Sequence, residues 1–233
     1  MNKNRIKIIH ETSPKAKGSV LYWLQHTQRI DQNYALYEAI HYANQHAKPL
    51  KVVFVLNPDY PEANARHFTF MLEGIVELFE SLYQLGIDCE MVQGDFESVL
   101  PAKIRESSAF FMDKAYTRYL RTIKESMAKI AVQENIPTFM VESDLIVPIE
   151  TASNKLEYAA RTIRPKLHKV KDAFLTLEET PKLKIKNPKR QSLIEGSLET
   201  FISNLPIDHS VQKAPGFKGG EKAALKRLES FID

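Results

Sequence analysis

The sequence predicts an α/β fold, a doubly wound, Rossmann-like sheet of five parallel strands with helices on both faces. Short apolar runs rich in β-forming residues alternate along the chain with segments whose apolar residues recur at helical spacing. Each helical segment is long enough to cross over between parallel strands. The chain has 233 residues, of which 43% are hydrophobic and 26% are charged, so it can bury a substantial core.

The predicted strands are apolar runs bounded by turn residues. The clearest one reads LKVVFVL and is followed directly by Asn57-Pro58-Asp59. In chain order, the five predicted strands are residues 20–24, 50–56, 88–92, 109–112 and 138–141.

The segments between these strands have helical spacing. The longest carries one apolar stripe and stops before Gly86, and this stripe consists of Phe70, Met71, Ile75, Leu78, Phe79 and Leu82. The four predicted helices are residues 32–45, 66–85, 98–106 and 117–135. Right-handed crossovers through these helices give the doubly wound order.

The chain divides into four predicted parts. Residues 1–17 form a polar N-terminal segment, residues 18–145 the α/β domain, residues 146–216 a basic connector and residues 217–233 the start of a further domain. Residues 155–190 contain eleven Lys or Arg against four Asp or Glu, a local net charge of +7 in a chain of +3. Three prolines and little periodicity make residues 183–216 an irregular connector.

A helix is predicted after Gly219-Gly220. The segment EKAALKRLESFI carries an apolar stripe of Ala224, Leu225, Leu228, Phe231 and Ile232. Because the sequence stops there, this pattern favours the first element of another domain whose remainder is missing. The alternative is a helix that docks back on the α/β domain.

Several classes of function lack their motifs. The first strand is followed by Gln25-His26-Thr27-Gln28-Arg29, without the glycines of a dinucleotide site, and the sequence has neither a P-loop nor an HExxH motif. The single cysteine, Cys89, excludes a disulfide within the chain and a cysteine-rich zinc site. We therefore expect neither a metal site nor a catalytic set in this chain, and we expect a cytoplasmic protein because no apolar run is long enough to span a membrane.

Ligands of such sheets bind outside the carboxyl ends of the strands. The loops there are residues 25–31, 57–66, 94–97, 113–117 and 142–148. Arg29 and Asp31 either pair with each other at the surface or form the wall of a site. Arg66 and His67 begin a long helix, where a cation opposes the helix dipole, so we expect them to contact a ligand or a partner domain.

Residues 151–168 form the densest polar cluster. If the part before Pro165 is helical, Glu157 and Arg161 are an i, i+4 pair, and Arg164 is biased toward an extended exit. One interpretation is a solvated helix with a salt bridge. The other is that the guanidinium groups hold a carboxylate, a phosphate or neighbouring backbone.

Four segments together resemble the amino-terminal part of class II cyclobutane pyrimidine dimer photolyases. They are VLYWLQHTQRIDQNYAL, PLKVVFVL, ARHFTFMLEGIVEL and IVPIETASNKLEYAARTIRPKLH, and the final GEKAALKRLESFI is similar to the first helix of the family's second domain. The sequence departs from the family's pattern at Gln25-His26, where Ser-Arg is usual, and at Tyr34 and Glu150, where Trp is common.

The resemblance implies that a full-length relative uses reduced FAD, excited by light, to split dimers flipped out of UV-damaged DNA. FAD and the dimer would occupy a helical domain beginning near residue 217 and missing from this chain, so we expect the chain alone to be inactive. It also implies a possible deazaflavin-type antenna chromophore, for which the candidate residues are His26, Arg29, Asn33, Asn57, Asp113 and Lys114. Arg161, Arg164 and Lys166 are candidates for contact with DNA or with the helical domain.

Two other functions remain open. The chain could be a free-standing module of the photolyase type that binds a chromophore or a protein and is not an enzyme. A nucleotide-binding enzyme of the related α/β type has less support, because the glycine-rich loop is absent.

Overall fold

The computed structural model describes residues 2–188, 193–194 and 196–232. Lys189 and Arg190, two of the eleven basic residues counted in the connector, therefore lie outside the described residues. One six-stranded sheet has the strand order β1-β6-β5-β2-β3-β4. Its parallel strands match the five predicted ones and are β2 (Val20–Trp23), β3 (Leu50–Leu56), β4 (Asp88–Gln93), β5 (Ala109–Asp113) and β6 (Thr138–Val141). The doubly wound α/β fold is therefore confirmed.

The sixth strand is an addition that the sequence did not predict. β1 (Ile6–His10) follows a short 3-10 helix (Lys3–Arg5) and pairs antiparallel with β6 at the sheet edge. Arg5 holds it in place, because its guanidinium donates to the carbonyls of Leu145 and Ile146 at 2.8 and 2.7 Å and lies 4.1 Å from the ring centre of Tyr34. Residues 6–10 of the polar N-terminal segment thus belong to the sheet.

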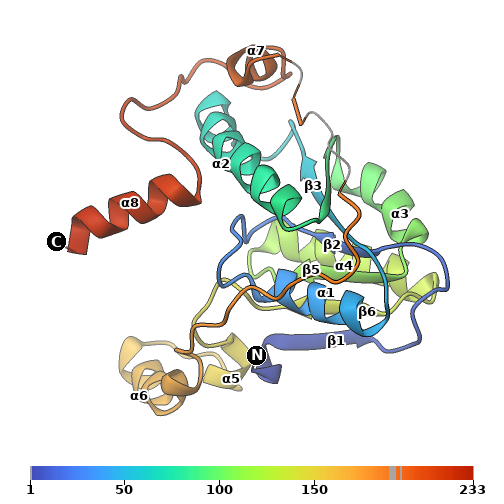
Figure 1. The fold of residues 1–233 in the computed structure, drawn as a ribbon. Coiled ribbons are helices and arrows are strands. Elements are labelled where there is room, and N and C mark those ends of the chain that lie inside the picture. Colours follow the sequence, from blue (N-terminus) through green and yellow to red (C-terminus); the bar gives the residue numbers. More distant parts are fainter. Residues whose placement is uncertain (1, 189–192, 195, 233) are drawn as a thin grey trace.

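Two pairs of helices cover the two faces of the sheet (Figure 1). α1 (Tyr34–Gln45) and α2 (Ala65–Gln84) pack with one buried cluster, while α3 (Phe96–Glu106) and α4 (Arg118–Gln133) pack with the other. None of the helices in the described part of the chain is both long and apolar enough to cross a membrane.

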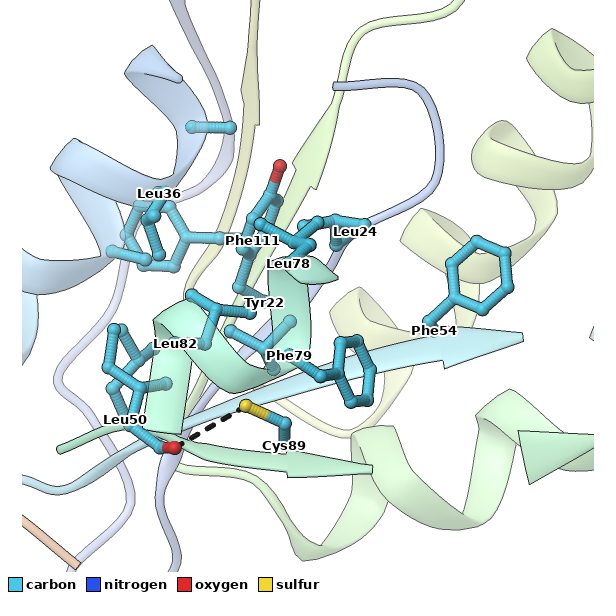
Figure 2. Packing of buried hydrophobic residues seen from close by; sticks show 14 of the residues in the cluster. Tyr22, Leu24, Leu36, Leu50, Phe54, Leu78, Phe79, Leu82, Cys89 and Phe111 are labelled. Carbon is cyan, nitrogen blue, oxygen red and sulfur yellow. Dashed lines mark hydrogen bonds between the residues drawn. The ribbon is translucent and has the colours of Figure 1, made fainter. Parts of the chain in front are cut away.

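The face below α1 and α2 has an aliphatic and aromatic core. Figure 2 shows Tyr22 and Phe111 from the sheet beside Leu78 and Leu82 of α2. Cys89 lies in this core, and burial raises the pKa of its thiol to about 12. The thiol therefore stays protonated, as expected for a structural cysteine.

Residues 149–173 form helices beside the N-terminus (Figure 1). They are α5 (Ile149–Ala152), α6 (Ala160–Val170) and a 3-10 turn (Lys171–Ala173). The expected extended exit at Arg164 is wrong, because α6 continues through Pro165. The expected Glu157–Arg161 pair is also not formed, since Glu157 precedes α6 and pairs with Lys166.

The segment expected to be irregular contains α7 (Leu198–Ser203). Leu183, Ile202 and Leu205 are buried in the cluster below α1 and α2. This connector therefore completes one face of the α/β core.

α8 (Glu221–Ile232) is held at its first turn by α2 and otherwise extends away (Figure 1). Carboxylates of Glu73 and Glu77 accept the backbone N–H groups of Gly219 and Lys222 at 2.8 and 3.0 Å. Gly74 lets the two segments approach closely, because a Cβ there would lie 3.1 Å from the nitrogen of Gly220. Leu225, Leu228, Phe231 and Ile232, the apolar stripe of α8, remain at least half exposed.

Candidate functional site

A pocket lies at the carboxyl ends of β2 and β3, where the sequence predicted a ligand. It has a volume of about 460 Å³ and is called the edge pocket below. Its apolar lining comes from β3, α2, α3 and α4 and includes Val55, Phe68, Met71, Phe96 and Leu120. Its polar lining includes Gln25, His26, Gln28, Asn57 and His67.

Asp113 is the last residue of β5, which lies beside β2 at the point where the strand order reverses. Its carboxylate accepts the hydroxyl of Tyr22 at 2.5 Å and the backbone N–H groups of Gln25 and His26 at 3.1 and 3.0 Å. Burial and the Asp113 charge raise the pKa of Tyr22 well above its usual value. Asp113 therefore shapes the loop after β2 and does not line the pocket.

Asn33 and Arg29 also shape this loop. The side chain of Asn33 accepts the N–H of Leu36 at 2.9 Å, capping α1, and donates to the carbonyl of Thr27 at 3.1 Å. Arg29 donates to backbone carbonyls, including that of Ser143 at 2.7 Å, and not to the carboxylate of Asp31. These residues fix the loop that carries Gln25 and His26.

Of the six antenna candidates, His26 and Asn57 line the edge pocket. Asn57 is buried, and its side-chain oxygen accepts the N–H of Asp59 at 2.9 Å. His26 is partly buried, and its Nδ1 is a buried atom without a hydrogen-bond partner among the described residues. Burial, followed by the positive charge of Lys124, lowers the pKa of His26, so its imidazole is neutral at neutral pH.

His67 lies at the start of α2, as the sequence indicated. Its Nδ1 accepts the backbone N–H of Asn64 at 3.2 Å, so the neutral ring carries its proton on Nε2. Arg66 instead donates to the carbonyl of Gln212 at 3.3 Å. Of these two residues, only His67 lines the pocket.

Lys114 lies apart from the edge pocket and pairs with Glu150. The sequence did not single out the apolar lining, because apolar side chains of a pocket have the same spacing as those of a core. Gln25 belongs to the predicted loop 25–31 but was not among the antenna candidates. Within the described part of the chain, no three His, Cys, Asp or Glu side chains gather as a metal ion would require.

The three basic candidates of the connector differ in their surroundings. Arg161 and Arg164 are exposed on α6, without an ion pair to any described residue. Lys166 bonds to Glu157 and to the hydroxyl of Ser153, and the pKa of Glu157 falls to about 2, mainly because of the Lys166 contact. Two cations are thus free, and the third is part of an internal network.

The DNA photolyase family model matches residues 20–186, which covers five of the six strands and the edge pocket. The chain belongs to the DNA photolyase family. Deoxyribodipyrimidine photo-lyases from Methanothermobacter thermautotrophicus and Arabidopsis thaliana are 33% and 32% identical over 100% and 98% of the chain. The chain covers 51% and 48% of these proteins, so it spans about half the length of these photolyases.

Solved structures have the same photolyase fold. A cryptochrome from Synechocystis has a TM-score of 0.71 over 95% of this chain and 47% of its own. An archaeal photolyase from Sulfolobus tokodaii, described as having two FAD molecules that imply a novel light-harvesting cofactor, has a TM-score of 0.67 over 90% of this chain and 46% of its own. Both are 18% identical in sequence, so they establish the fold.

Proposed function

We propose that this chain is the amino-terminal part of a class II deoxyribodipyrimidine photo-lyase and holds its antenna chromophore in the edge pocket. The complete protein splits cyclobutane pyrimidine dimers in UV-damaged DNA by electron transfer from light-excited, reduced FAD. The class is supported by the ARHFTFMLEGIVEL segment, which forms α2, and by residues 146–168. Gly74, the glycine of the ARHFTFMLEGIVEL segment, lies where Gly220 approaches α2.

The edge pocket carries the antenna proposal. Apolar walls with a few polar groups are typical of sites for ring-shaped ligands, and the volume of about 460 Å³ is sufficient for a tricyclic ring. Gln25, His26 and Asn57 line the pocket from the loops that follow β2 and β3, and their polar side chains orient such a ring. A deazaflavin-type chromophore is a tricyclic ring of this kind.

The electron-transfer chemistry belongs to a helical FAD domain that begins near α8. The single tryptophan of the chain, Trp23, is fully buried in β2, so this portion does not supply a relay of several tryptophans. The chain's own contribution is to bind the chromophore, exclude water from it and pack on the helical domain. The exposed Arg161 and Arg164 contact that domain or the DNA backbone.

The test is a titration of the purified chain with 8-hydroxy-5-deazariboflavin, followed by fluorescence. Ala63 lines the pocket, so Ala63→Trp fills it and abolishes binding, whereas Ala102→Trp on the exposed side of α3 leaves binding unchanged. Binding that is absent in the wild type, or unaffected by Ala63→Trp, contradicts the antenna role.

The assembly proposal is tested by repair. The chain alone lacks flavin colour and repairs no dimers under blue light, whereas mixing it with the separately produced helical half of a photolyase restores repair. A free-standing chromophore module is the second candidate, since all the lining residues of the edge pocket lie between Gln25 and Leu120, within the α/β domain. That candidate is favoured if the chain binds the chromophore but associates with no helical half.

A further inference from the structure

Lys124 is a fully buried lysine on α4, between the apolar residues Leu120 and Met127 of the same helix. Its ammonium nitrogen has no hydrogen-bond partner among the described residues and lies 4.6 Å from the ring centre of Trp23. Lysines are rarely buried without a partner, because the charge loses its hydration. The proposed function does not so far use this residue.

The contacts of Trp23 connect Lys124 to the edge pocket. The indole ring lies 5.6 Å from the ring of Phe96, and its N–H donates to the side-chain oxygen of Gln25 at 3.1 Å. Phe96, Gln25 and Leu120, one turn before Lys124 on α4, all line the pocket. Lys124 is therefore one layer of side chains behind the pocket wall.

No described anion neutralises Lys124 at close range. The charges of Asp113 and Asp144 favour its protonated form, but Asp113 bonds to Tyr22 and to the loop after β2, while Asp144 accepts the hydroxyl of Thr27. The charged groups beside it on α4, Arg121 and Glu125, pair with each other at the surface. The packed faces of β2 and α3 contribute Trp23 and Phe96, which are uncharged. Lys124 also lines a second pocket with Lys7, Lys114 and Glu150, and Lys114 and Glu150 pair with each other there.

The field of Lys124 reaches the pocket. His26, which lines the pocket, has its pKa lowered by burial and, second, by the charge of Lys124. Its buried Nδ1 also lacks a partner. The charges of Asp113 and Asp144 act on His26 in the opposite sense, and Glu62, an exposed carboxylate, also lines the pocket. Lys124 is thus the one positive charge among the three that act on His26.

We infer that Lys124 makes the edge pocket selective for a ring that carries delocalised negative charge, by acting as its counter-charge through the wall formed by Trp23, Gln25 and Phe96. This inference rests on the proposed chromophore site. Lys124 touches no ligand, so it is a residue that sets specificity and not a catalytic one. In a low-dielectric interior, one unneutralised charge discriminates strongly between anionic and neutral ligands of equal shape.

The test compares two probes of nearly the same shape. 8-Hydroxy-5-deazariboflavin ionises on its ring hydroxyl, whereas its 8-methoxy analogue does not. The wild type binds the ionised hydroxy form at least about tenfold more tightly than the methoxy form, and Lys124→Met brings this ratio close to one. Lys129→Met, an exposed change on the same helix, keeps the wild-type ratio.

A spectroscopic measurement with the hydroxy probe alone gives a second readout. The pKa of the ring hydroxyl falls by about one unit on binding, as followed by absorption, because the ammonium favours the ring anion. Lys124→Met abolishes this fall. Equal binding of both probes by the wild type, or an unchanged hydroxyl pKa, overturns the inference while the pocket remains a chromophore site. If neither probe binds, the proposed antenna function is wrong as well.

Discussion

Replacing Lys124 with methionine is expected to stabilise the protein at neutral pH. Methionine has nearly the same length and an apolar stem, so it fills the same space between α4 and Trp23 without a charge. If Lys124 serves to bind a ligand, its buried ammonium lowers the free energy of unfolding of the unliganded protein. If it instead serves the fold, the same substitution destabilises.

The magnitude follows from the pKa of Lys124, which falls from 10.5 to about 8. Burial lowers it, and the charges of Asp113 and Asp144 only partly oppose this effect. At about 1.4 kcal/mol per pKa unit, the penalty on the charged form is about 3 kcal/mol. The cation–π contact with Trp23 offsets about 1–2 kcal/mol. Lys124→Met therefore gains about 1–2 kcal/mol, or about 2–8 °C in Tm for a chain of this size.

The pH dependence has a definite sign. Below the folded-state pKa of about 8, folded and unfolded chains are both protonated at Lys124, and the penalty is fully present. Between about 8 and 10.5, the unfolded chain binds more protons than the folded one, so the wild type gains stability as the pH rises. The difference in the free energy of unfolding between Lys124→Met and the wild type thus becomes smaller as the pH rises over this range.

The assay is urea unfolding followed by far-UV circular dichroism at neutral pH and at about pH 10. Lys129→Met is the matched control, because it removes an exposed lysine from the same helix and changes stability by less than about 0.5 kcal/mol. A Lys124→Met protein that is less stable than wild type at neutral pH, or whose advantage does not change with pH, would refute this reasoning.

Three further predictions concern the loop after β2, the contact between α2 and Gly220, and the basic connector. Asp113→Ala leaves a hydroxyl and backbone N–H groups unpaired and lowers the free energy of unfolding by about 2–4 kcal/mol in urea titrations; an unchanged midpoint contradicts its structural role. Gly74→Val displaces Gly220 and speeds tryptic cleavage within α8, and an unchanged cleavage rate contradicts the close contact. Arg161→Ala with Arg164→Ala weakens binding to a separately produced helical half or to DNA by about tenfold at low salt, while unchanged binding of both indicates a merely solvated helix.

Much of the fold was predictable because local pattern and tertiary structure agree in it. Leu50–Leu56 is apolar at every position except Lys51, as expected for a strand buried on both faces, and it forms β3 with the predicted bounds. β1 was missed because a short edge strand among charged residues has a weak pattern, and its pairing depends on Arg5 contacts to a distant loop. The exit at Pro165 was wrong because α6 continues through this proline, although its ring removes one backbone hydrogen bond of the helix. Ile163 and Leu167 share a face of α6 and line a pocket together with apolar residues of the segment 145–149.

The site was predictable in place but not in detail. Parallel strands bring polar loop residues to one edge, and that topology located the pocket. Asn and Asp at such an edge serve equally well as ligand contacts, helix caps or acceptors for loop N–H groups. Asn57 lines the pocket, while Asn33 caps α1 and Asp113 holds the loop after β2, and this division follows from contacts between distant segments.

Lys124 did leave a signal in the sequence. It follows Leu120 and precedes Ala128 by one helical turn each, so a lysine stands in the apolar stripe that packs α4 on the sheet. Local pattern and burial favour an apolar residue there, and the long stem of lysine gives the stripe no advantage over methionine. A residue that interrupts its own helix's packing pattern, remains unpartnered when buried and acts electrostatically on a neighbouring pocket is better explained by ligand selection than by folding.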